Sequence, residues 1–293
     1  MPTAFHCIGI IGKQGDPQVQ ASLRALADFL RRRHRRIVLD EATAQAWPEE
    51  RFEHCQRGQL GSDCDLVIVM GGDGTLLNAA RSLADFGVPL LGVNLGRLGF
   101  LTDVSPSEML DALEEILEGH YLREERFLLH ARIRHHDELR AESYAFNDVV
   151  LHKWDAARMI EFETYVDDQF VYSQRSDGLI VSTPTGSTAY ALSGGGPILH
   201  PKLDALVLVP ICPHTLSARP IVVTGDSRVE IVVSDANDGD TRVTCDGQVN
   251  FRLQAGDRLQ IARKEQTITL IQPTDHNYYG ILRAKLHWGR KVT

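Results

Sequence analysis

The sequence lacks the features that mark secreted proteins, proteins with a structural zinc site and membrane-spanning proteins. Its five cysteines are odd in number and none belongs to a Cys-x-x-Cys pair, so neither a disulfide framework nor a zinc site is predicted. No apolar stretch approaches the roughly 18 residues that a membrane span needs. The first apolar run has no basic segment before it and no cleavage pattern, so it is interpreted as a strand and not as a signal peptide. These absences predict a soluble protein of the reducing cytoplasm, without a membrane partner.

An excess of basic charge is also missing, because the formal net charge is −8. Binding to nucleic-acid phosphates requires a basic face, so a nucleic-acid partner is not expected. The exception is residues 31–36, RRRHRR, for which two interpretations remain. The run is either the C-terminal end of a helix, where the macrodipole favours cations, or a patch for a regulatory partner or nucleic acid. The helix end is the favoured interpretation.

Two hydrophobic patterns divide the 293 residues. As far as residue 125, strands alternate with helices, as in a parallel sheet covered by helices. The run DLVIVM at residues 65–70 is typical of a central strand of such a sheet. From Arg126 onward, short alternating segments predict a mostly β region, with hairpin turns at Asp167-Asp168 and Asp246-Gly247.

We therefore predict the fold class α/β + β, with two domains. Residues 1–125 form a Rossmann-like, parallel-sheet nucleotide-binding domain, for which residues 275–293 are a candidate completion. Residues 126–274 form a β-rich, sandwich-like domain.

The segment GGDGT, residues 71–75, carries the clearest chemical signal. It stands between DLVIVM and a predicted helix at residues 76–86, so its glycines and the helix N-terminus predict a phosphate cradle formed by Gly71, Gly72, Gly74 and Thr75. The segment is neither a Walker A loop nor a G-x-G-x-x-G fingerprint, which disfavours a dehydrogenase. Phosphate repels an aspartate, so Asp73 is interpreted as catalytic or metal-linked, with an N-cap as the alternative.

Two further segments predict ligand contacts. Residues 177–197 are dense in glycine, serine and threonine, including Thr183, Thr185, Ser187, Thr188 and Ser193. Their hydroxyls could bind a polar ligand, and a turn-rich loop without a ligand is the alternative. Asn147 and Asp148 interrupt an apolar strand, so they are predicted to face a ligand, unless they form a satisfied structural pair.

These motifs together resemble those of ATP-dependent bacterial NAD kinases of the Gram-negative type. GGDGT alone also occurs in phosphofructokinases and diacylglycerol-type lipid kinases, but its combination with Asn147-Asp148 and TPTGSTAY is specific to NAD kinases. The resemblance extends over nearly the whole chain, through LGFLTDV (residues 98–104), LEGHY (117–121), the segment from SQRSDG to GGGPIL (173–199) and PHTLSARP (213–220).

The resemblance implies an NAD kinase that transfers the γ-phosphoryl group of ATP to the 2′-hydroxyl of the adenosine ribose of NAD. Asp73 matches the catalytic aspartate, and Asp148 stands where the family often has glutamate. The β-rich domain would bind NAD. The implied NAD-binding residues are Gly74, Asn147, Asp148, Arg158, Arg175, Asp177, Thr188, Ala189, Tyr190, Ala191, Leu192, Ser193 and Gln248.

The resemblance also implies partners and a cofactor. Mg²⁺ would act together with ATP, and no metal ligand from the protein is assigned, since the histidines show no metal-binding spacing. NAD and ATP are the expected substrates, and self-association as a homotetramer or homodimer is expected. Two other functions remain open: a lipid or sugar kinase of the GGDGT group, and a non-catalytic NAD(H)-binding regulator.

Overall fold

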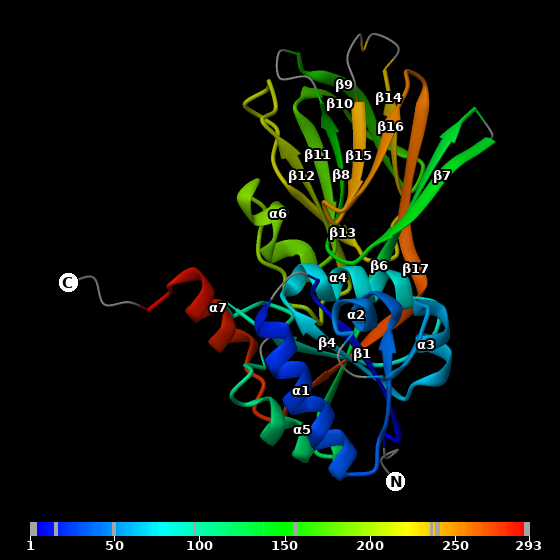
Figure 1. The fold of residues 1–293 in the computed structure, drawn as a ribbon. Coiled ribbons are helices and arrows are strands. Elements are labelled where there is room, and N and C mark those ends of the chain that lie inside the picture. The colour runs from blue at the N-terminus through cyan, green and yellow to red at the C-terminus, as the bar shows by residue number, and fades with distance from the viewer. Residues whose placement is uncertain are drawn as a thin grey trace. The chain divides into compact units, whose positions relative to one another are not determined.

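The chain divides into two compact units in the computed structural model (Figure 1). The first unit consists of Met1–Glu125 with Thr267–Thr293, and the second of Arg126–Gln266. The chain passes from one unit to the other within two strands, β6 (Leu122–His135) and β17 (Asp257–Gln272). The structure describes residues 5–14, 17–48, 51–96, 98–102, 104–136, 138–154, 158–234, 237 and 241–289. Asp103 of the LGFLTDV motif and residues 290–293 of the candidate completion therefore lie outside the described residues.

The first unit is built on a parallel sheet with the strand order β17-β5-β4-β1-β2-β3. Strand β4 lies between β1 and β5 and is fully buried, as its continuous apolar run predicts. The strands that belong to this unit alone are β1 Cys7–Gly12, β2 Arg36–Asp40, β3 Glu53–Cys55, β4 Leu66–Gly71 and β5 Leu90–Asn94.

Helices cover this sheet. Apolar residues of α1 and α5 share one core with the strands, and Val19, Leu23, Leu26 and Leu30 of α1 are all buried in it. These four residues recur at the spacing of one helical face, which explains why the segment forms an amphipathic helix. The helices of the first unit are α1 Pro17–Arg32, α2 Glu41–Ala46, α3 Arg57–Asp63, α4 Asp73–Leu83, α5 Met109–Leu117 and α7 Tyr278–Leu286.

The basic run at residues 31–36 lies at the C-terminal end of α1, where the sequence favours it. Arg31 and Arg32 belong to the last turn of the helix. Arg33 forms an ion pair with Glu114, and Arg36 forms one with Glu53. Much of the positive charge is thus compensated within the first unit, which supports the helix-end interpretation over a partner-binding patch.

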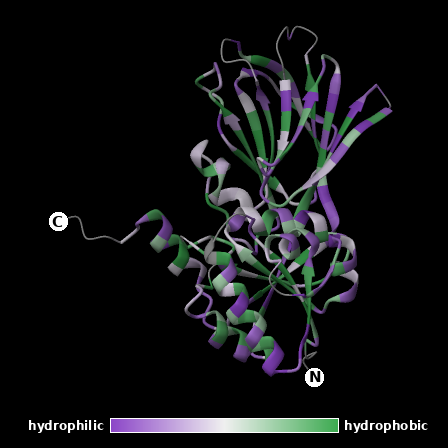
Figure 2. Ribbon diagram, in the orientation of Figure 1, coloured by the Kyte–Doolittle hydropathy of each residue, from purple (hydrophilic) through white to green (hydrophobic). Residues whose placement is uncertain are grey.

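The second unit is a sandwich of antiparallel sheets. One sheet has the strand order β13-β12-β11-β8-β15-β16, and the other contains β10-β9-β14-β17 with β6 and β7. Buried side chains from both sheets form a single apolar cluster, and in Figure 2 hydrophobic and hydrophilic residues alternate along these strands. The elements of this unit are β7 Glu138–Ala145, β8 Asp148–Lys153, β9 Ile160–Val166, β10 Gln169–Ser176, β11 Gly178–Ser182, η1 Thr185–Thr188, α6 Tyr190–Ser193, β12 Ala205–Ile211, β13 Ile221–Thr224, β14 Val229–Val233, β15 Thr241–Cys245 and β16 Val249–Leu253.

Both predicted hairpin turns are present, and both have left-handed backbone conformations. The φ angles are 50° and 63° at Asp167 and Asp168, and 52° and 64° at Asp246 and Gly247. Aspartate and glycine tolerate this conformation better than most residues do. The parallel sheet followed by antiparallel strands confirms the predicted fold class.

The start of the predicted ligand-binding loop at residues 177–197 is wrong. Residues 178–182, GLIVS, form the buried strand β11, which pairs with β8 and β12. Sequence patterning misses this strand because the apolar run is short and lies between residues typical of turns. Among the described residues, no helix is both long enough and apolar enough to cross a membrane.

Candidate functional site

The GGDGT segment lies directly after a buried strand and at the start of a helix, as predicted. Strand β4 ends at Gly71, Gly72 is the N-cap residue, and α4 begins at Asp73. The N–H groups of Thr75 and Leu76 donate to the carbonyl oxygen of Gly72 at 2.9 and 3.3 Å, which closes the first turn. The N-terminus of a helix carries partial positive charge, so this arrangement favours an anion.

Packing within the chain requires glycine at position 71 of the segment but not at position 72. A Cβ atom on Gly71 would lie 2.4 Å from Thr75 Oγ1, so packing within the chain requires glycine there. A Cβ atom on Gly72 would meet nothing within 4 Å, and the φ angle of −101° suits any residue. Neither packing nor conformation requires glycine at position 72, so the bare backbone there is open to the close approach of a ligand.

The carboxylate of Asp73 is held by the loop that follows β5. Phe100 N donates to Oδ2 at 2.8 Å, while Leu101 N and Thr102 N donate to Oδ1 at 3.0 and 3.1 Å. Thr102 Oγ1 donates to the same Oδ1 at 3.1 Å, and a Cβ atom on Gly99 would lie 2.1 Å from it. Asp73 is the first helical residue and not the N-cap, so the N-cap alternative is wrong. Four charge-assisted hydrogen bonds instead fix the direction of its carboxylate.

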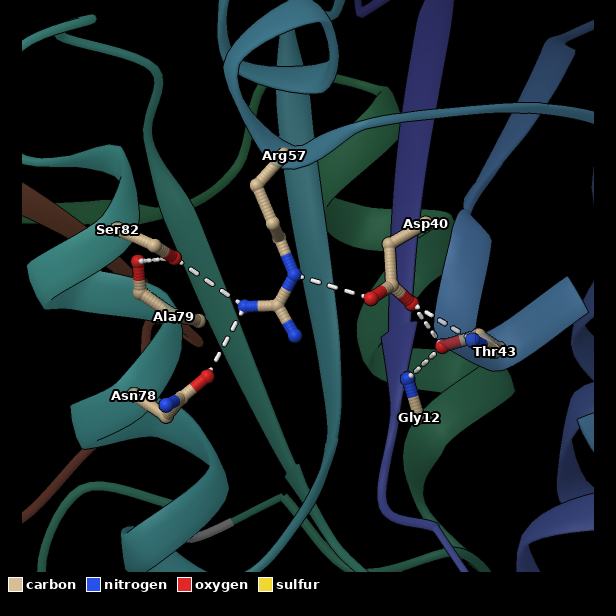
Figure 3. A network of polar contacts seen from close by, with 7 residues as sticks. All are labelled: Gly12, Asp40, Thr43, Arg57, Asn78, Ala79 and Ser82. Carbon is tan, nitrogen blue, oxygen red and sulfur yellow. Dashed lines mark hydrogen bonds and ion pairs between the residues drawn. The ribbon is translucent and has the colours of Figure 1, made fainter. Parts of the chain in front are cut away.

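A partly buried ion pair joins β2 to α3, and hydrogen bonds from the same arginine reach α4 (Figure 3). Arg57 Nε donates to Asp40 Oδ2 at 3.0 Å, and the Asp40 side chain is only 4% exposed. Thr43 donates to the other oxygen of Asp40 through both its backbone N–H and its hydroxyl. Arg57 Nη1 also donates to Asn78 Oδ1 and Ser82 Oγ on α4, both at 3.2 Å. The network therefore anchors the helix that carries the GGDGT segment.

The second unit contains a cavity of about 500 Å³ in which several predicted NAD-binding residues meet. The residues predicted from the sequence that line it are Asn147, Asp148, Asp177, Ala189 and Tyr190. They come from three separate segments of the sequence and offer two carboxylates, an amide and a phenol. The other lining residues are Val150, His152, Lys153, Ile211, Thr244, Asp246 and Gly247. A cavity of about 580 Å³ elsewhere in this unit contains none of the predicted residues.

Other predicted NAD contacts are not part of the 500 Å³ lining. Arg158 and Gln248 are exposed. Arg175 is exposed as well, and its Nε atom lies 3.6 Å from Glu161 Oε1. Thr188, Leu192 and Ser193 lie on the short helical segments η1 and α6, next to the lining residues Ala189 and Tyr190.

Ala191 follows the lining residues Ala189 and Tyr190 but is not itself part of the cavity lining. It is completely buried and packs with Ile180, Leu199 and Val209 in a small apolar cluster. In this structure Ala191 anchors α6 to the sheet, and its contact with NAD stays a prediction.

Asp148 and Asp246 place two carboxyl groups at the cavity. Asp148 is 4% exposed, and burial disfavours the charged form of a carboxyl group. This burial, reinforced by the negative charge of Asp246, raises the pKa of Asp148 to about 7. Asp148 therefore changes its charge close to neutral pH, whereas an ordinary aspartate does so at about pH 4.

The hydroxyl groups after β11 bind the chain itself, and not all of them are available to a ligand. Thr183 Oγ1 donates to the carbonyl oxygen of Phe146 at 2.7 Å, and Ser182 Oγ donates to that of Asn147 at 3.1 Å. Ser187 Oγ donates to the carbonyl of Pro184 at 2.7 Å and accepts from the N–H of Leu199. The predicted use of Thr183 and Ser187 as ligand contacts is therefore corrected, because buried hydroxyls that already have partners shape the loop.

Sequence reasoning missed two charged residues of the cavity. Lys153 Nζ lies 2.7 Å from Asp177 Oδ1, and both residues line the cavity. Asp246 was recognised only as part of a turn. The alternation along β8 is a usable signal, since Asp148, Val150 and His152 stand two positions apart and line the same cavity. No comparable local pattern points to Lys153 or Asp246.

Comparison with known proteins adds an independent line of support. The family profile described as the ATP-NAD kinase N-terminal domain matches residues 8–121, and the profile for the C-terminal domain matches residues 146–272. The NAD kinase of Pseudomonas entomophila is 54% identical over 288 residues, which cover 98% of this chain and 97% of that protein.

Solved structures agree with this result. A yeast NADH kinase complexed with NADH superposes with a TM-score of 0.89 over 99% of this chain and 90% of that one; at 21% identity it shows the fold alone. An NAD kinase from Archaeoglobus fulgidus in complex with ATP, 25% identical, has a TM-score of 0.74 over 95% and 99% of the two chains. Both family domains match, and the sequence identity to the Pseudomonas entomophila enzyme is 54% over nearly the full length. These matches show that this chain belongs to the NAD kinase family.

Proposed function

We propose that this chain transfers the γ-phosphoryl group of ATP to the 2′-hydroxyl of the adenosine ribose of NAD, giving NADP and ADP. The observation that carries the proposal is the cavity of the second unit, where Asn147, Asp148, Asp177 and Tyr190 converge. Amide, carboxylate and phenol groups suit the base edge and hydroxyls of a nucleoside. In this proposal the first unit is the nucleotide-binding domain and the second unit is the NAD-binding domain.

Asp73 is the proton acceptor in this proposal. A carboxylate has about four lone-pair positions. Oδ1 of Asp73 already accepts three hydrogen bonds, while Oδ2 accepts one, from Phe100 N. Oδ2 therefore keeps the capacity to accept the hydrogen of a sugar hydroxyl. Phosphoryl transfer has a loose transition state, so the contribution of Asp73 is to orient the hydroxyl and to take its proton late, as the new bond forms.

The GGDGT segment would hold phosphate oxygens. The open backbone at Gly72 and the N-terminus of α4 supply N–H groups and a positive dipole end without introducing a mobile side chain. Gly71, Gly74 and Thr75 complete the predicted phosphate loop. In-line positioning of this kind is the main part of catalysis for a reaction in which the protein performs little covalent chemistry.

Mg²⁺ fits this site as an ion that arrives with ATP. Mg²⁺ usually keeps several waters and binds through substrate phosphates and one or two carboxylates, so a protein cage is not required. The described residues do bring Glu115, Glu118 and His120 together as potential ligands, but these are exposed near the end of α5 and apart from the GGDGT segment in the chain. The metal would neutralise triphosphate charge, and we assign no protein ligand to it.

We extend the proposal to self-association as a homotetramer or homodimer and to a location in the cytoplasm. The supporting observation for the location is that all five cysteines are free, three of them buried, as suits a reducing compartment. Size-exclusion chromatography with light scattering gives the mass in solution, and a monomeric mass would contradict the first extension.

The test is a coupled assay for NADP. Purified protein is incubated with ATP and Mg²⁺ and with NAD, NADH, fructose 6-phosphate or a diacylglycerol as the acceptor. We expect NADP to accumulate with NAD in step with ADP. Release of ADP with only a non-nucleotide acceptor would instead support a lipid or sugar kinase, and NAD binding without ADP release would support a regulator. The run with NADH measures the preference between the two dinucleotides.

A further inference from the structure

The turn between β15 and β16 places the carboxylate of Asp246 within hydrogen-bond distance of the backbone N–H groups of Asn147 and Asp148. Asp246 and Gly247 adopt left-handed conformations, and the N–H of Gln248 closes the turn on the carbonyl of Cys245 at 3.0 Å. Strand β15 pairs with β8, with Cys245 opposite Val149. The turn therefore ends next to the start of β8, where the Asn147-Asp148 pair lies.

Three consecutive N–H groups donate to the Asp246 carboxylate. Phe146 N donates to Oδ2 at 3.0 Å, and Asn147 N and Asp148 N donate to Oδ1 at 2.7 and 3.3 Å. The N–H of Asp246 in turn donates to the carbonyl oxygen of Asp148 at 2.9 Å. Hydrogen bonds to a charged acceptor are stronger than neutral ones, so this contact fixes the backbone at the point where two predicted ligand-binding side chains branch from it.

The other side of the same backbone is also fixed. The carbonyl oxygen of Asn147 accepts from Thr183 N at 2.9 Å and from Ser182 Oγ at 3.1 Å. Gly186 passes so close that a Cβ atom there would lie 2.2 Å from this oxygen. The Asn147 peptide groups thus have fixed partners on both sides. The only negatively charged partner of their N–H groups among these contacts is Asp246.

We propose that Asp246 is a positioning residue for the nucleotide-binding pair Asn147-Asp148, and that its negative charge acts on Asp148 in addition to burial. The inference rests on the proposed function, because it takes the cavity as the NAD site. Asp246 acts through Asn147 and Asp148 and is not assigned a contact with the reacting atoms.

The charge effect follows from the groups around Asp148. The titratable side chains that line the cavity with it are His152, Lys153, Asp177, Tyr190 and Asp246. Lys153 is paired with Asp177 at 2.7 Å, and the charge of Asp246 is the one that raises the pKa of Asp148 beyond the effect of burial. An ionised carboxylate is the stronger acceptor for a sugar hydroxyl, so the affinity for NAD should rise with pH through about 7.

Two variants separate position from charge. Asp246→Asn keeps the shape and tolerates the left-handed conformation, but its amide group cannot accept from all three N–H groups, and the charge is lost. Asp246→Glu keeps the charge and moves the acceptor by one methylene. A matched control exists in the other predicted hairpin. Asp167 has a φ angle of 50°, its Oδ1 accepts from Arg228 N at 2.8 Å, and its own N–H donates to the Arg228 carbonyl at 2.9 Å.

The measurements are KM for NAD, KM for ATP and kcat between pH 5.5 and 8.5, with Tm as a check on folding. At pH 8 we expect both Asp246 variants to raise KM for NAD about 10-fold, as loss of a hydrogen bond to a charged group does, and to leave KM for ATP within about twofold. The break in kcat/KM for NAD should lie near pH 7 in the wild type, move to lower pH in Asp246→Asn and stay in place in Asp246→Glu. Asp167→Asn should change neither quantity.

A wild-type KM for NAD in both variants, or an unmoved break in Asp246→Asn, overturns the inference. If Asp246→Asn does not fold, Asp246→Glu still decides the positioning role through KM. Calorimetric titration with NAD in the absence of ATP keeps the test independent of the proposed reaction. A wild-type protein that binds NAD without phosphorylating it contradicts the proposed function. In that case a higher Kd for NAD in Asp246→Asn than in Asp167→Asn supports the role of Asp246, and equal Kd values overturn it.

Discussion

The two units contain the same arrangement, an aspartate whose carboxylate accepts hydrogen bonds from the backbone N–H groups of three consecutive residues. In the first unit Asp73 accepts from residues 100–102, and in the second Asp246 accepts from residues 146–148. Asp73 belongs to the conspicuous motif, and the amides hold it in place. Asp246 belongs to a turn, and it holds the amides in place. The backbone positions the carboxylate in one unit, and the carboxylate positions the backbone in the other.

This difference teaches that a hydrogen-bond pattern alone does not identify a reactive carboxylate. The surroundings separate the two cases. Asp73 follows Gly72, whose backbone is open to a ligand, and its Oδ2 accepts only one hydrogen bond from these neighbours. Asp246 faces the buried Asp148, whose pKa it helps to raise. The first arrangement suits proton transfer, whereas the second suits selection and orientation of a ligand.

The largest expected effect separates the two aspartates by the step they influence. Asp73→Asn should lower kcat about 1,000-fold, because a positioned general base contributes roughly 10²–10⁴-fold, while KM for NAD changes little. Asp246→Asn should instead raise KM for NAD and change kcat little. Steady-state NADP formation measures both quantities, and circular dichroism checks the fold. A folded Asp73→Asn enzyme with near wild-type turnover would remove the distinction between the two sites.

The stability of the second unit should depend on Asp148 in a defined pH window. The unfolded carboxyl ionises near 3.8 and the folded one near 7, so the folded state retains a proton that the unfolded state has released. Stability that is present below pH 4 is therefore lost as the pH rises to about 7. The side chain of Asp148→Asn cannot titrate. The free energy of unfolding of this variant, relative to that of the wild type, should therefore increase by roughly 4 kcal/mol as the pH rises through this window. Urea unfolding at several pH values measures this difference, and parallel curves would contradict it.

The anchoring of α4 tests whether Asp73 depends on a rigid frame as Asn147-Asp148 depends on Asp246. Arg57→Ala leaves the buried Asp40 without its charged partner and removes the bonds to Asn78 and Ser82, so we expect a loss of about 3 kcal/mol in unfolding free energy. The matched control is Arg36→Ala, which breaks an exposed pair whose side chains are both 51% exposed and should have no measurable effect. Equal losses in the two variants would show that the Arg57 network does not anchor the helix.

The smallest effect concerns the loop that holds Asp73. A Cβ atom on Gly99 would lie 2.1 Å from Asp73 Oδ1, so Gly99→Ala must displace the carboxylate and should lower kcat about 30-fold, in the range that misplacement of a catalytic group produces. Gly96 lies in the same loop, and a Cβ atom there would meet nothing within 4 Å. Gly96→Ala should therefore leave kcat unchanged. The same assay measures both variants, and equal activities would mean that the direction of the Asp73 carboxylate is not critical.

Local patterns predicted the elements that depend on neighbouring residues in the chain. The strand before Gly71 and the turns at Asp167 and Asp246 follow from hydrophobic patterning or turn chemistry. The resemblance to NAD kinases, and not periodicity, supplied Asp177 and Tyr190 as candidate site residues. Their presence in one cavity with Asn147 and Asp148 is a structural finding that no spacing rule contains.

The remaining features depend on tertiary contacts. The loop that holds Asp73 comes from residues 100–102, and the carboxylate that holds Asn147 comes from position 246, so neither partner is visible in a local window. In the sequence of strand β17, Arg263, Lys264, Glu265 and Gln266 interrupt the apolar pattern, which would divide it into two strands. The structure continues through them, since Lys264 is buried and its Nζ atom lies 4.4 Å from the ring centroid of Tyr144.

The discontinuity of the first unit has a consequence for biosynthesis. Its sheet is completed by β17, whose Leu270 pairs with Leu90, and its core includes Ile271. A ribosome must therefore synthesise all of residues 126–266 before the sheet that begins at Cys7 can close. Domains generally fold in the order of their synthesis, but here the inserted sandwich can mature while the earlier segment still awaits its last strand. During translation, the parallel strands of the first unit therefore lack their edge strand until β17 has been synthesised.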